Sequence, residues 1–331
     1  MNMHIKELFP KIGLVFPLAA SLTIGISSQA TAASLGVASD YNVFTLGNYY
    51  QERTDVEGKL AVGGNATFTG GFGVGSRLSS GSGNVLVTGG NLTLNNGQVS
   101  NGNTVYGGTA NVSGVGFPNG TLSQGNPIDF NAAGTYLKDL SSYLSGLTPT
   151  ANTTVQSWGG INLLGNSSSL NIFNLSGADL SKTNYFELNA TNSSTVVVNV
   201  SGKDVSMKNF GFNLMNTNRQ KVLYNFYEAT SLDISGIGIE GSILAPLANV
   251  NFNNGQINGN LIAGSLTGTG ESHNYLFNGS LPDMPAKENP SIPVEQSVPE
   301  PSTWLGLGLV SALLGMSRRQ RKQLKIVNAK S

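Results

Sequence analysis

A short phrase of alternating residues closed by an asparagine–glycine turn recurs in this chain. It occupies residues 55–68, 85–99 and 240–264. Two copies open with Glu-Gly, at Glu57 and Glu240, and two close with Asn-Asn-Gly-Gln. Alternation of apolar and polar residues is typical of strands with one buried face. The Asn-Gly pairs supply the positive φ that tight turns need.

Internal similarity of this kind predicts a solenoid, in which similar coils stack and equivalent side chains form ladders. Short β-branched runs such as residues 195–200 recur between the copies, so the low charge content does not indicate disorder. We therefore expect a mainly β body over residues 34–280, a right-handed β-helix-like solenoid. An ordinary β-sandwich of hairpins stays open, because the spacing of the copies is irregular.

One stretch breaks the β pattern and predicts an amphipathic helix over residues 129–147. Asp129 is a suitable N-cap and Gly146 a suitable stop. A membrane-surface role is disfavoured because the helix has few cations, so we expect it to flank the β body. Apolar residues recur with a period of about 3.6 at Phe130, Ala133, Tyr136, Leu137, Leu140, Tyr143, Leu144 and Leu147.

The first 33 residues have the organisation of a signal peptide. Lys6 and Lys11 precede an apolar run over residues 12–26, and an Ala-Thr-Ala cleavage motif follows. An N-terminal membrane helix is the alternative, which Pro17 and the small residues disfavour. We expect export through the inner membrane and an N-terminal signal helix. The predicted cleavage region comprises Ala30, Ala32 and Ala33.

The C-terminal segment carries three parts in order. The tripeptide Pro299, Glu300 and Pro301 precedes an apolar run over residues 303–316, and a basic cluster follows. As a helix this run would reach roughly 21 Å, short of the roughly 30 Å hydrocarbon core. It therefore suits a segment held transiently in the membrane with its cations in the cytoplasm. The basic cluster comprises Arg318, Arg319, Arg321 and Lys322.

This order resembles the PEP-CTERM sorting signal, here over residues 299–325. The resemblance implies an exosortase-type protease as partner, which cuts near the tripeptide, and a final place at the cell surface or outside the cell. A short permanent C-terminal anchor is the alternative. The proline-rich residues 281–298 are expected to form a stiff linker between body and signal.

Charge and cysteine content exclude several classes of function. The chain has 18 basic and 18 acidic residues, but eight basic residues lie in the two end signals. The remainder carries about −6, which offers no basic face for nucleic acid. The absence of cysteine excludes thiolate metal sites and cysteine nucleophiles. The Gly-Gly pairs lack the Asp of calcium-binding nonapeptide repeats, so we expect no metal and no cofactor.

The body also resembles the choice-of-anchor A domain of bacterial surface proteins. The matching phrases are residues 40–44, 55–58, 128–130, 222–226 and 240–279. The resemblance implies an extracellular, adhesive, β-helical domain that occurs with different anchoring tails. It brings no ligand and no catalytic residue.

Catalysis is not expected. His273 is the single histidine of the mature body, and no nucleophile-elbow phrase accompanies it. Glu57 and Glu240 occupy equivalent places in two phrases, which favours a repeated structural role such as accepting backbone N–H groups at a turn. The carboxylates that would have to act in glycoside hydrolysis are Glu57, Glu240, Asp233 and Glu271.

Three functions stay open at this point. The first is an adhesive surface or matrix protein that binds cells, exopolysaccharide or biofilm, for which the aromatic ring of Trp158 suits sugar contacts. The second is a binder of ice or another regular surface, indicated by Thr67-Phe68-Thr69 and Thr267-Gly268-Thr269. The third is a polysaccharide-modifying enzyme built on a β-helix.

Overall fold

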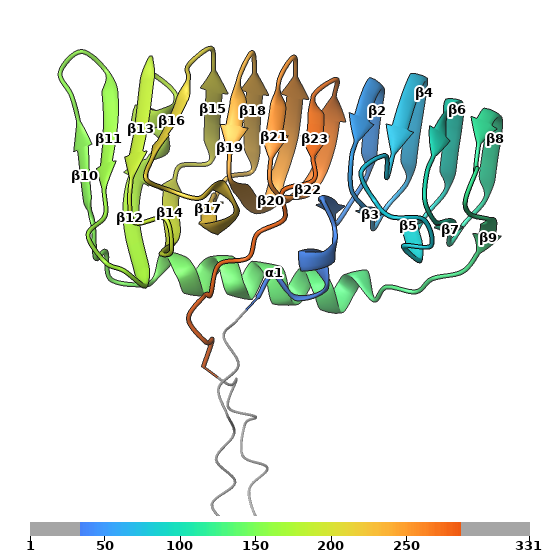
Figure 1. The fold of residues 1–331 in the computed structure, drawn as a ribbon, viewed down its shortest axis with the longest axis horizontal. Coiled ribbons are helices and arrows are strands. Elements are labelled where there is room, and N and C mark those ends of the chain that lie inside the picture. The colour runs from blue at the N-terminus through green and yellow to red at the C-terminus, as the bar shows by residue number, and fades with distance from the viewer. Residues whose placement is uncertain (1–33, 286–331) are drawn as a thin grey trace, which may run out of the picture. The chain divides into compact units, whose positions relative to one another are not determined.

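The computed structural model describes residues 34–285, and this part of the chain is mainly β. It contains 23 strands, in a 19-stranded and a 4-stranded sheet, and two α-helices. The large sheet is curled and its strands pair in parallel (Figure 1). The predicted signal helix, the C-terminal hydrophobic helix, the cleavage region and the sorting residues lie outside the described residues.

The first nine strands build one half of the large sheet. They are β1 (Val43–Thr45), β2 (Tyr49–Val56), β3 (Leu60–Val62), β4 (Ala66–Val74), β5 (Asn84–Thr88), β6 (Leu92–Val99), β7 (Asn103–Tyr106), β8 (Ala110–Gly116) and β9 (Leu122–Gln124). The odd-numbered strands pair in one parallel ladder, and the even-numbered strands pair in a second. Each layer of the chain therefore adds one strand to each ladder.

The later strands build the other half of the large sheet and the whole of the four-stranded sheet. They are β10 (Asn152–Val155), β11 (Gly160–Leu164), β12 (Leu170–Ser176), β13 (Tyr185–Asn189), β14 (Thr195–Ser201), β15 (Asp204–Lys208), β16 (Phe212–Met215), β17 (Val222–Asn225), β18 (Ser231–Ser235), β19 (Gly238–Glu240), β20 (Ser242–Asn253), β21 (Gln256–Asn258), β22 (Leu261–Gly268) and β23 (Glu271–His273).

These later strands extend both ladders and add a third. β12, β14, β17, β20 and β22 continue the first ladder, whereas β15, β18, β20 and β22 continue the second. β19, β21 and β23 form a third ladder. The four-stranded sheet has the order β10-β11-β13-β16 and is not hydrogen-bonded to β19. The third face is therefore interrupted between β16 and β19.

The two halves meet where the first strand pairs with a late one. Val43 of β1 pairs in parallel with Leu261 of β22. The side-chain amide of Asn42 strengthens this seam by donating to the carbonyl of Gly259 at 2.8 Å. The chain therefore starts in the middle of the stack, winds to one end, crosses to the other and winds back to the middle.

This arrangement corrects the predicted right-handed β-solenoid. The structure shows a curled parallel sheet whose layers do not follow in sequence order, because residues 43–45 lie between residues 60–62 and 261–263. The repeated phrases identify strands that stack, but they carry no information on which layers become neighbours. The sandwich of hairpins is also wrong, because among the described strands only β10 and β11 pair antiparallel.

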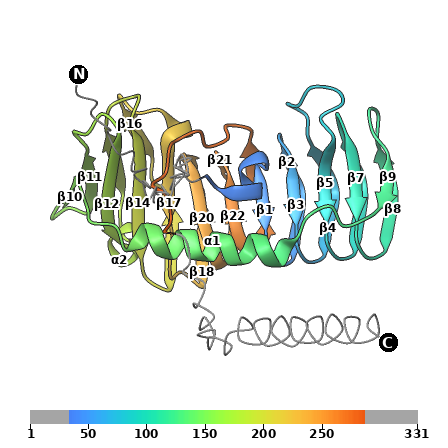
Figure 2. The same ribbon diagram turned by 90° about the horizontal axis from the view of Figure 1, so that it is seen from below.

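Helix α1 (Phe130–Ser145) connects the two halves and runs lengthwise across the first ladder (Figures 1 and 2). Asp129 caps it by accepting hydrogen bonds from the backbone N–H groups of Asn131 and Ala132. Gly146 is the C-cap, so the predicted flanking helix is confirmed. The second helix, α2 (Gly177–Leu180), is a single turn. Neither helix in residues 34–285 is long and apolar enough to cross a membrane.

The first ladder separates two apolar cores. On β22, Leu261 and Ala263 point into the inner core, whereas Ile262 points outward into a second core beneath α1. Leu137 and Leu140 of α1 belong to this outer core. Strands covered on both sides read as continuous apolar runs, which explains why the first-ladder strands do not alternate. Ladder residues of the outer core are Phe44, Ala61, Val87, Val197, Leu223, Leu244 and Ile262.

A ladder of asparagines forms the corner between the first and second ladders. The side-chain oxygen of Asn48 accepts from the N–H of Asn65 at 2.9 Å, and that of Asn65 accepts from the N–H of Asn91 at 2.8 Å. Each of these asparagine oxygens occupies the space that a side chain on the second glycine of the next layer would need. A Cβ on Gly64 would be 2.4 Å from Asn48 Oδ1, and one on Gly90 would be 2.5 Å from Asn65 Oδ1. The Gly-Gly-Asn phrase is therefore a packing requirement.

Candidate binding surfaces

The outer side of the second ladder presents a regular row of side chains, which we call the polar face. Inward residues such as Phe68 and Phe252 are buried in the inner core, so their neighbours along the strands point outward. Adjacent members of the row are separated by about 4.8 Å, the spacing of neighbouring strands. The row comprises Ser206, Asp233, Asn251, Thr267, Tyr50, Thr67, Thr93 and Asn111.

The structure brings both predicted threonine motifs onto the polar face, but it interrupts them. Thr67 and Thr267 lie on either side of Tyr50, whose side chain is 43% exposed. In the next row Thr69 pairs with Glu52. The threonines therefore share a row without forming an unbroken one.

Side chains on the polar face are held by one another. Asn253 donates to the side-chain oxygen of Asn251 at 2.8 Å, and Lys208 pairs with Asp233 at 2.5 Å. These contacts fix the side chains at the β15–β20 end of the face before it meets any partner. Asp233, one of the four candidate carboxylates, is engaged here and lies apart from the other three.

The other candidate acids and the histidine belong to the third ladder. Register places Glu240 opposite Asn258, and Asn258 opposite His273. Val56 pairs with Ser272, so Glu57 follows next in the same row. Glu57 and Glu240 are thus three strands, about 14 Å, apart by strand spacing. Paired carboxylates that cleave glycosides lie about 5–10 Å apart, so these two are not placed as such a pair.

Both repeated glutamates make structural contacts. Glu57 accepts from the backbone N–H of Asn274 at 3.0 Å, which confirms the predicted role at that position. Glu240 differs from this prediction, because its carboxylate accepts from the side-chain amide of Asn258 at 2.9 Å and not from a backbone N–H group.

His273 belongs to the same chain of contacts. Its Nδ1 lies 2.8 Å from Asn258 Oδ1, and its Nε2 lies 3.5 Å from a carboxylate oxygen of Glu271. Ser272 points the other way and is buried. His273 is therefore not aligned with a serine nucleophile at this position.

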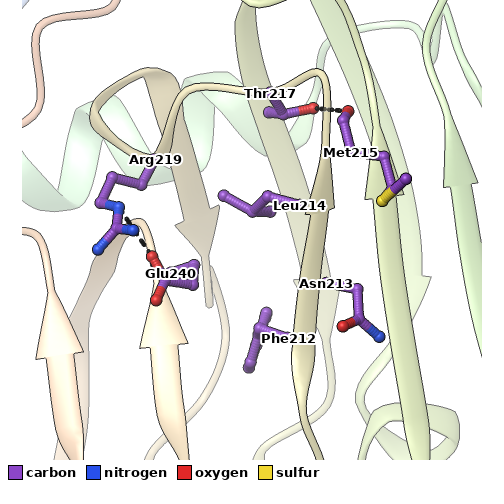
Figure 3. Close-up of a pocket in the computed structure, with 7 residues that line it drawn as sticks. All are labelled: Phe212, Asn213, Leu214, Met215, Thr217, Arg219 and Glu240. Carbon is purple, nitrogen blue, oxygen red and sulfur yellow. Dashed lines mark hydrogen bonds and ion pairs between the residues drawn. The ribbon is translucent and has the colours of Figure 1, made fainter.

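A pocket of about 380 Å³ opens where the third face is interrupted, between β16 and β19 (Figure 3). The Nε of Arg219 lies 2.9 Å from Oε2 of Glu240 across it. The guanidinium of Arg219 also stacks 5.0 Å from the ring centroid of Tyr275. The sequence did not mark Arg219 as a site residue. In residues 34–285, no group of three or more His, Asp or Glu side chains is arranged to hold a metal ion.

Residues 34–274 match a protein-family model described as "Putative Ice-binding-like adhesive domain". The chain belongs to this family. Residues 297–322 match a second model, the PEP-CTERM protein-sorting motif. The ice-binding-like adhesive domain is thus joined, in one chain, to a segment that contains Pro299–Pro301 and the predicted basic cluster. No curated protein matches the chain.

Ice-binding proteins of known structure are similar to this chain at low identity. The protein from the Antarctic ascomycete Antarctomyces psychrotrophicus is 16% identical, with 76% of this chain and all of that chain covered and a TM-score of 0.41. The Shewanella frigidimarina protein is 14% identical, with 75% and 98% covered and a TM-score of 0.36. TM-scores below 0.5 do not establish a common fold, so the family assignment rests on the sequence match.

Proposed function

We propose that this chain is an exported, non-enzymatic adhesive protein of the cell surface or extracellular matrix. The observation that carries the proposal is the union of an ice-binding-like adhesive domain, residues 34–274, with a PEP-CTERM motif, residues 297–322. The narrower resemblance to the choice-of-anchor A domain supports the same role. The partner surface is that of neighbouring cells or of the exopolysaccharide of a biofilm.

The route to the surface follows from the two end segments. A signal peptidase removes the first segment near Ala30, Ala32 and Ala33. An exosortase-type protease then cuts near Pro299–Pro301, while Arg318 and its neighbouring cations hold the tail at the cytoplasmic side of the inner membrane. Anchoring in the membrane is therefore transient.

A second candidate function is binding to ice or another regular surface. The observation that favours it is the in-register row of the polar face, which includes Thr67, Thr93 and Thr267. The surface of an ice crystal is flat and uncharged, so a protein face that binds it should also be flat and uncharged. Tyr50 protrudes between two of the threonines, and Asp233 is in the same row, so adhesion is the better supported function.

Two assays on the exported protein separate these functions. Retention on producing cells or on their exopolysaccharide, without thermal hysteresis, is the result expected for an adhesive protein. Thermal hysteresis without retention would instead establish the second candidate. In that case Thr93→Arg on the polar face should abolish the hysteresis, whereas Thr135→Arg on the exposed side of α1 should leave it intact. Absence of both activities would refute both proposals.

A further inference from the structure

Trp158 is held against the four-stranded sheet with one ring face uncovered. It lies in the turn between β10 and β11, and 57% of its surface is exposed. A Cβ built on Gly160 would lie 2.1 Å from Cη2 of the indole. The ring therefore rests flat on the backbone of Gly160, and only glycine leaves room for it. Exposing the apolar surface of a fixed indole to water is unfavourable. A ligand that covers the ring would remove this cost.

Tyr185 extends this surface on the neighbouring strand. It pairs with Gly160 in the register of β11 and β13, and its ring centroid lies 5.8 Å from that of Trp158. The phenol donates to Glu187 Oε2 at 2.6 Å. This hydrogen bond is the main reason why the pKa of Tyr185 is raised, and it fixes the ring. The two rings, which we call the aromatic platform, are therefore ordered in advance of binding.

Polar groups run beside the aromatic platform on the same outward side of the sheet. Thr154, Asn162, Glu187 and Asn213 occupy one register row across β10, β11, β13 and β16. They offer a hydroxyl, two amides and a carboxylate. Flat apolar rings flanked by a few hydrogen-bonding groups match a sugar, which presents an apolar ring face and hydroxyl edges.

The same row leads into the pocket at the free edge of β16. Asn213 belongs both to the row and to the pocket lining, together with Arg219 and Glu240 (Figure 3). Because Arg219 and Glu240 pair with each other, they add no net charge to the pocket. Glu187 leaves the row itself negative. A uronate or sulfated sugar would be repelled here, whereas a neutral sugar would not.

We propose that this surface is a glycan-binding site for a neutral polysaccharide. A sugar ring stacks on the exposed indole of Trp158, and Tyr185, whose ring plane is inclined by 56° to the indole, borders it on one side. The sugar hydroxyls bond to Asn162, Glu187 and Asn213. The chain of the polysaccharide continues toward the pocket of Arg219 and Glu240. The inference rests on the proposed adhesive function and assigns that function a ligand class and a place in the fold.

The sequence provides a direct optical readout of this site. The chain has two tryptophans, Trp158 and Trp304. In the full-length chain in detergent, Trp304→Phe leaves Trp158 as the single indole. We expect dextran, mannan or galactan to shift the emission of Trp158 to shorter wavelength, because a stacked sugar removes water from the ring. Alginate, a polyuronate, should produce no shift.

Variants then separate the platform from general surface effects. Trp158→Ala should weaken polymer binding, measured by affinity electrophoresis, by about tenfold or more, as for aromatic side chains that a partner covers on binding. Trp158→Phe should restore part of the affinity. Gly211→Leu is a steric test. Gly211 directly precedes Phe212, which pairs with Phe186, so the register places it next to Tyr185. A Cβ there meets no atom within 4 Å, so the leucine should obstruct the sugar without disturbing the fold. Leu247→Ala, which removes another exposed apolar side chain, should change nothing.

The outcomes distinguish this inference from the proposed function. If the exported protein is retained on cells or exopolysaccharide equally with and without Trp158, and no neutral polymer shifts the emission, the glycan site is wrong and adhesion stands. An equal response to alginate overturns the assigned ligand class. If neither cells nor any polymer are bound, both proposals fail.

Discussion

The side-chain amide of Asn225 donates a hydrogen bond of 2.9 Å to the side-chain oxygen of Asn199 on the neighbouring strand. The same amide donates to the carbonyl of Ser141 in α1, and the amide of Asn199 donates to the carbonyl of Leu144. All four residues are buried. Two stacked asparagines therefore bind the helix to the first ladder at its C-terminal end, within the otherwise apolar outer core.

Replacing Asn225 by alanine should loosen α1 from the sheet. The substitution removes the donor of the buried Asn199 oxygen and the acceptor of the buried Ser141 hydroxyl. Each buried polar group left without a partner costs about 1–3 kcal/mol. We expect the free energy of unfolding in urea to fall by at least that amount. Asn251→Ala, on the exposed polar face, is the matched control and should change it by less than about 0.5 kcal/mol. Equal losses would show that the helix contact is not the cause.

The asparagine corner gives a second prediction, at Gly90. A Cβ there would be 2.5 Å from Asn65 Oδ1 and 2.7 Å from the carbonyl of Gly64. The backbone carbonyl of Gly64 and the hydrogen-bonded amide of Asn65 cannot move away from a new methyl group without breaking the ladder. Gly90→Ala should therefore destabilise the fold by about 1–3 kcal/mol. Gly211→Ala is the control. Its Cβ meets no atom within 4 Å, and its φ is not positive, so no loss is expected in thermal unfolding.

Local sequence patterns predicted the mainly β fold class and the position of α1. The order of the strands in the sheet depends on long-range pairing. The alternation around Phe68 and Phe252 marked inward and outward residues correctly, and Asp129 marked the start of α1. The seam between Val43 and Leu261 has no local signal, since either strand would pair as well with another apolar strand. The predicted right-handed β-solenoid was wrong for this reason.

The candidate site was predictable only in part. Trp158 stood out because it is the single tryptophan of the body and lies beside two glycines. Tyr185 and Glu187 flank the inward residue Phe186, and this alternation gave a signal for their outward direction. Arg219 and Glu240 are brought together by the interruption between β16 and β19, which no sequence period records.

Proteolytic sorting predicts the mass of the mature protein. If an exosortase-type protease cuts near Pro299–Pro301, the exported chain should lack the hydrophobic run and the basic cluster. Intact mass spectrometry of the exported protein should place its C-terminus close to Pro301. Recovery of a chain that ends at Ser331 would favour a permanent anchor. Glu300→Ala should retain the uncut form in the membrane fraction, whereas Glu295→Ala, outside the motif, should not.

Asp55 gives the last prediction, a pH dependence of stability. The pKa of its carboxyl lies above the ordinary value of 3.8, chiefly because burial disfavours the charged form and secondly because Glu271 is close. The folded state therefore binds more protons than the unfolded state between the ordinary and the raised pKa. Stability falls as pH rises through this window, and the loss persists at neutral pH.

Asp55→Asn removes this charge but keeps an oxygen for the backbone N–H of Gly73. We expect the variant to be at least as stable as the parent at neutral pH, with a flatter profile of unfolding free energy above pH 3.8. Asp233→Asn is the matched control. Its carboxylate pairs with Lys208 at 2.5 Å, so the substitution should bring no gain. The measurement is the free energy of unfolding by chemical denaturation across the pH range. An Asp55→Asn variant that is less stable than the parent at neutral pH would contradict the raised pKa of Asp55.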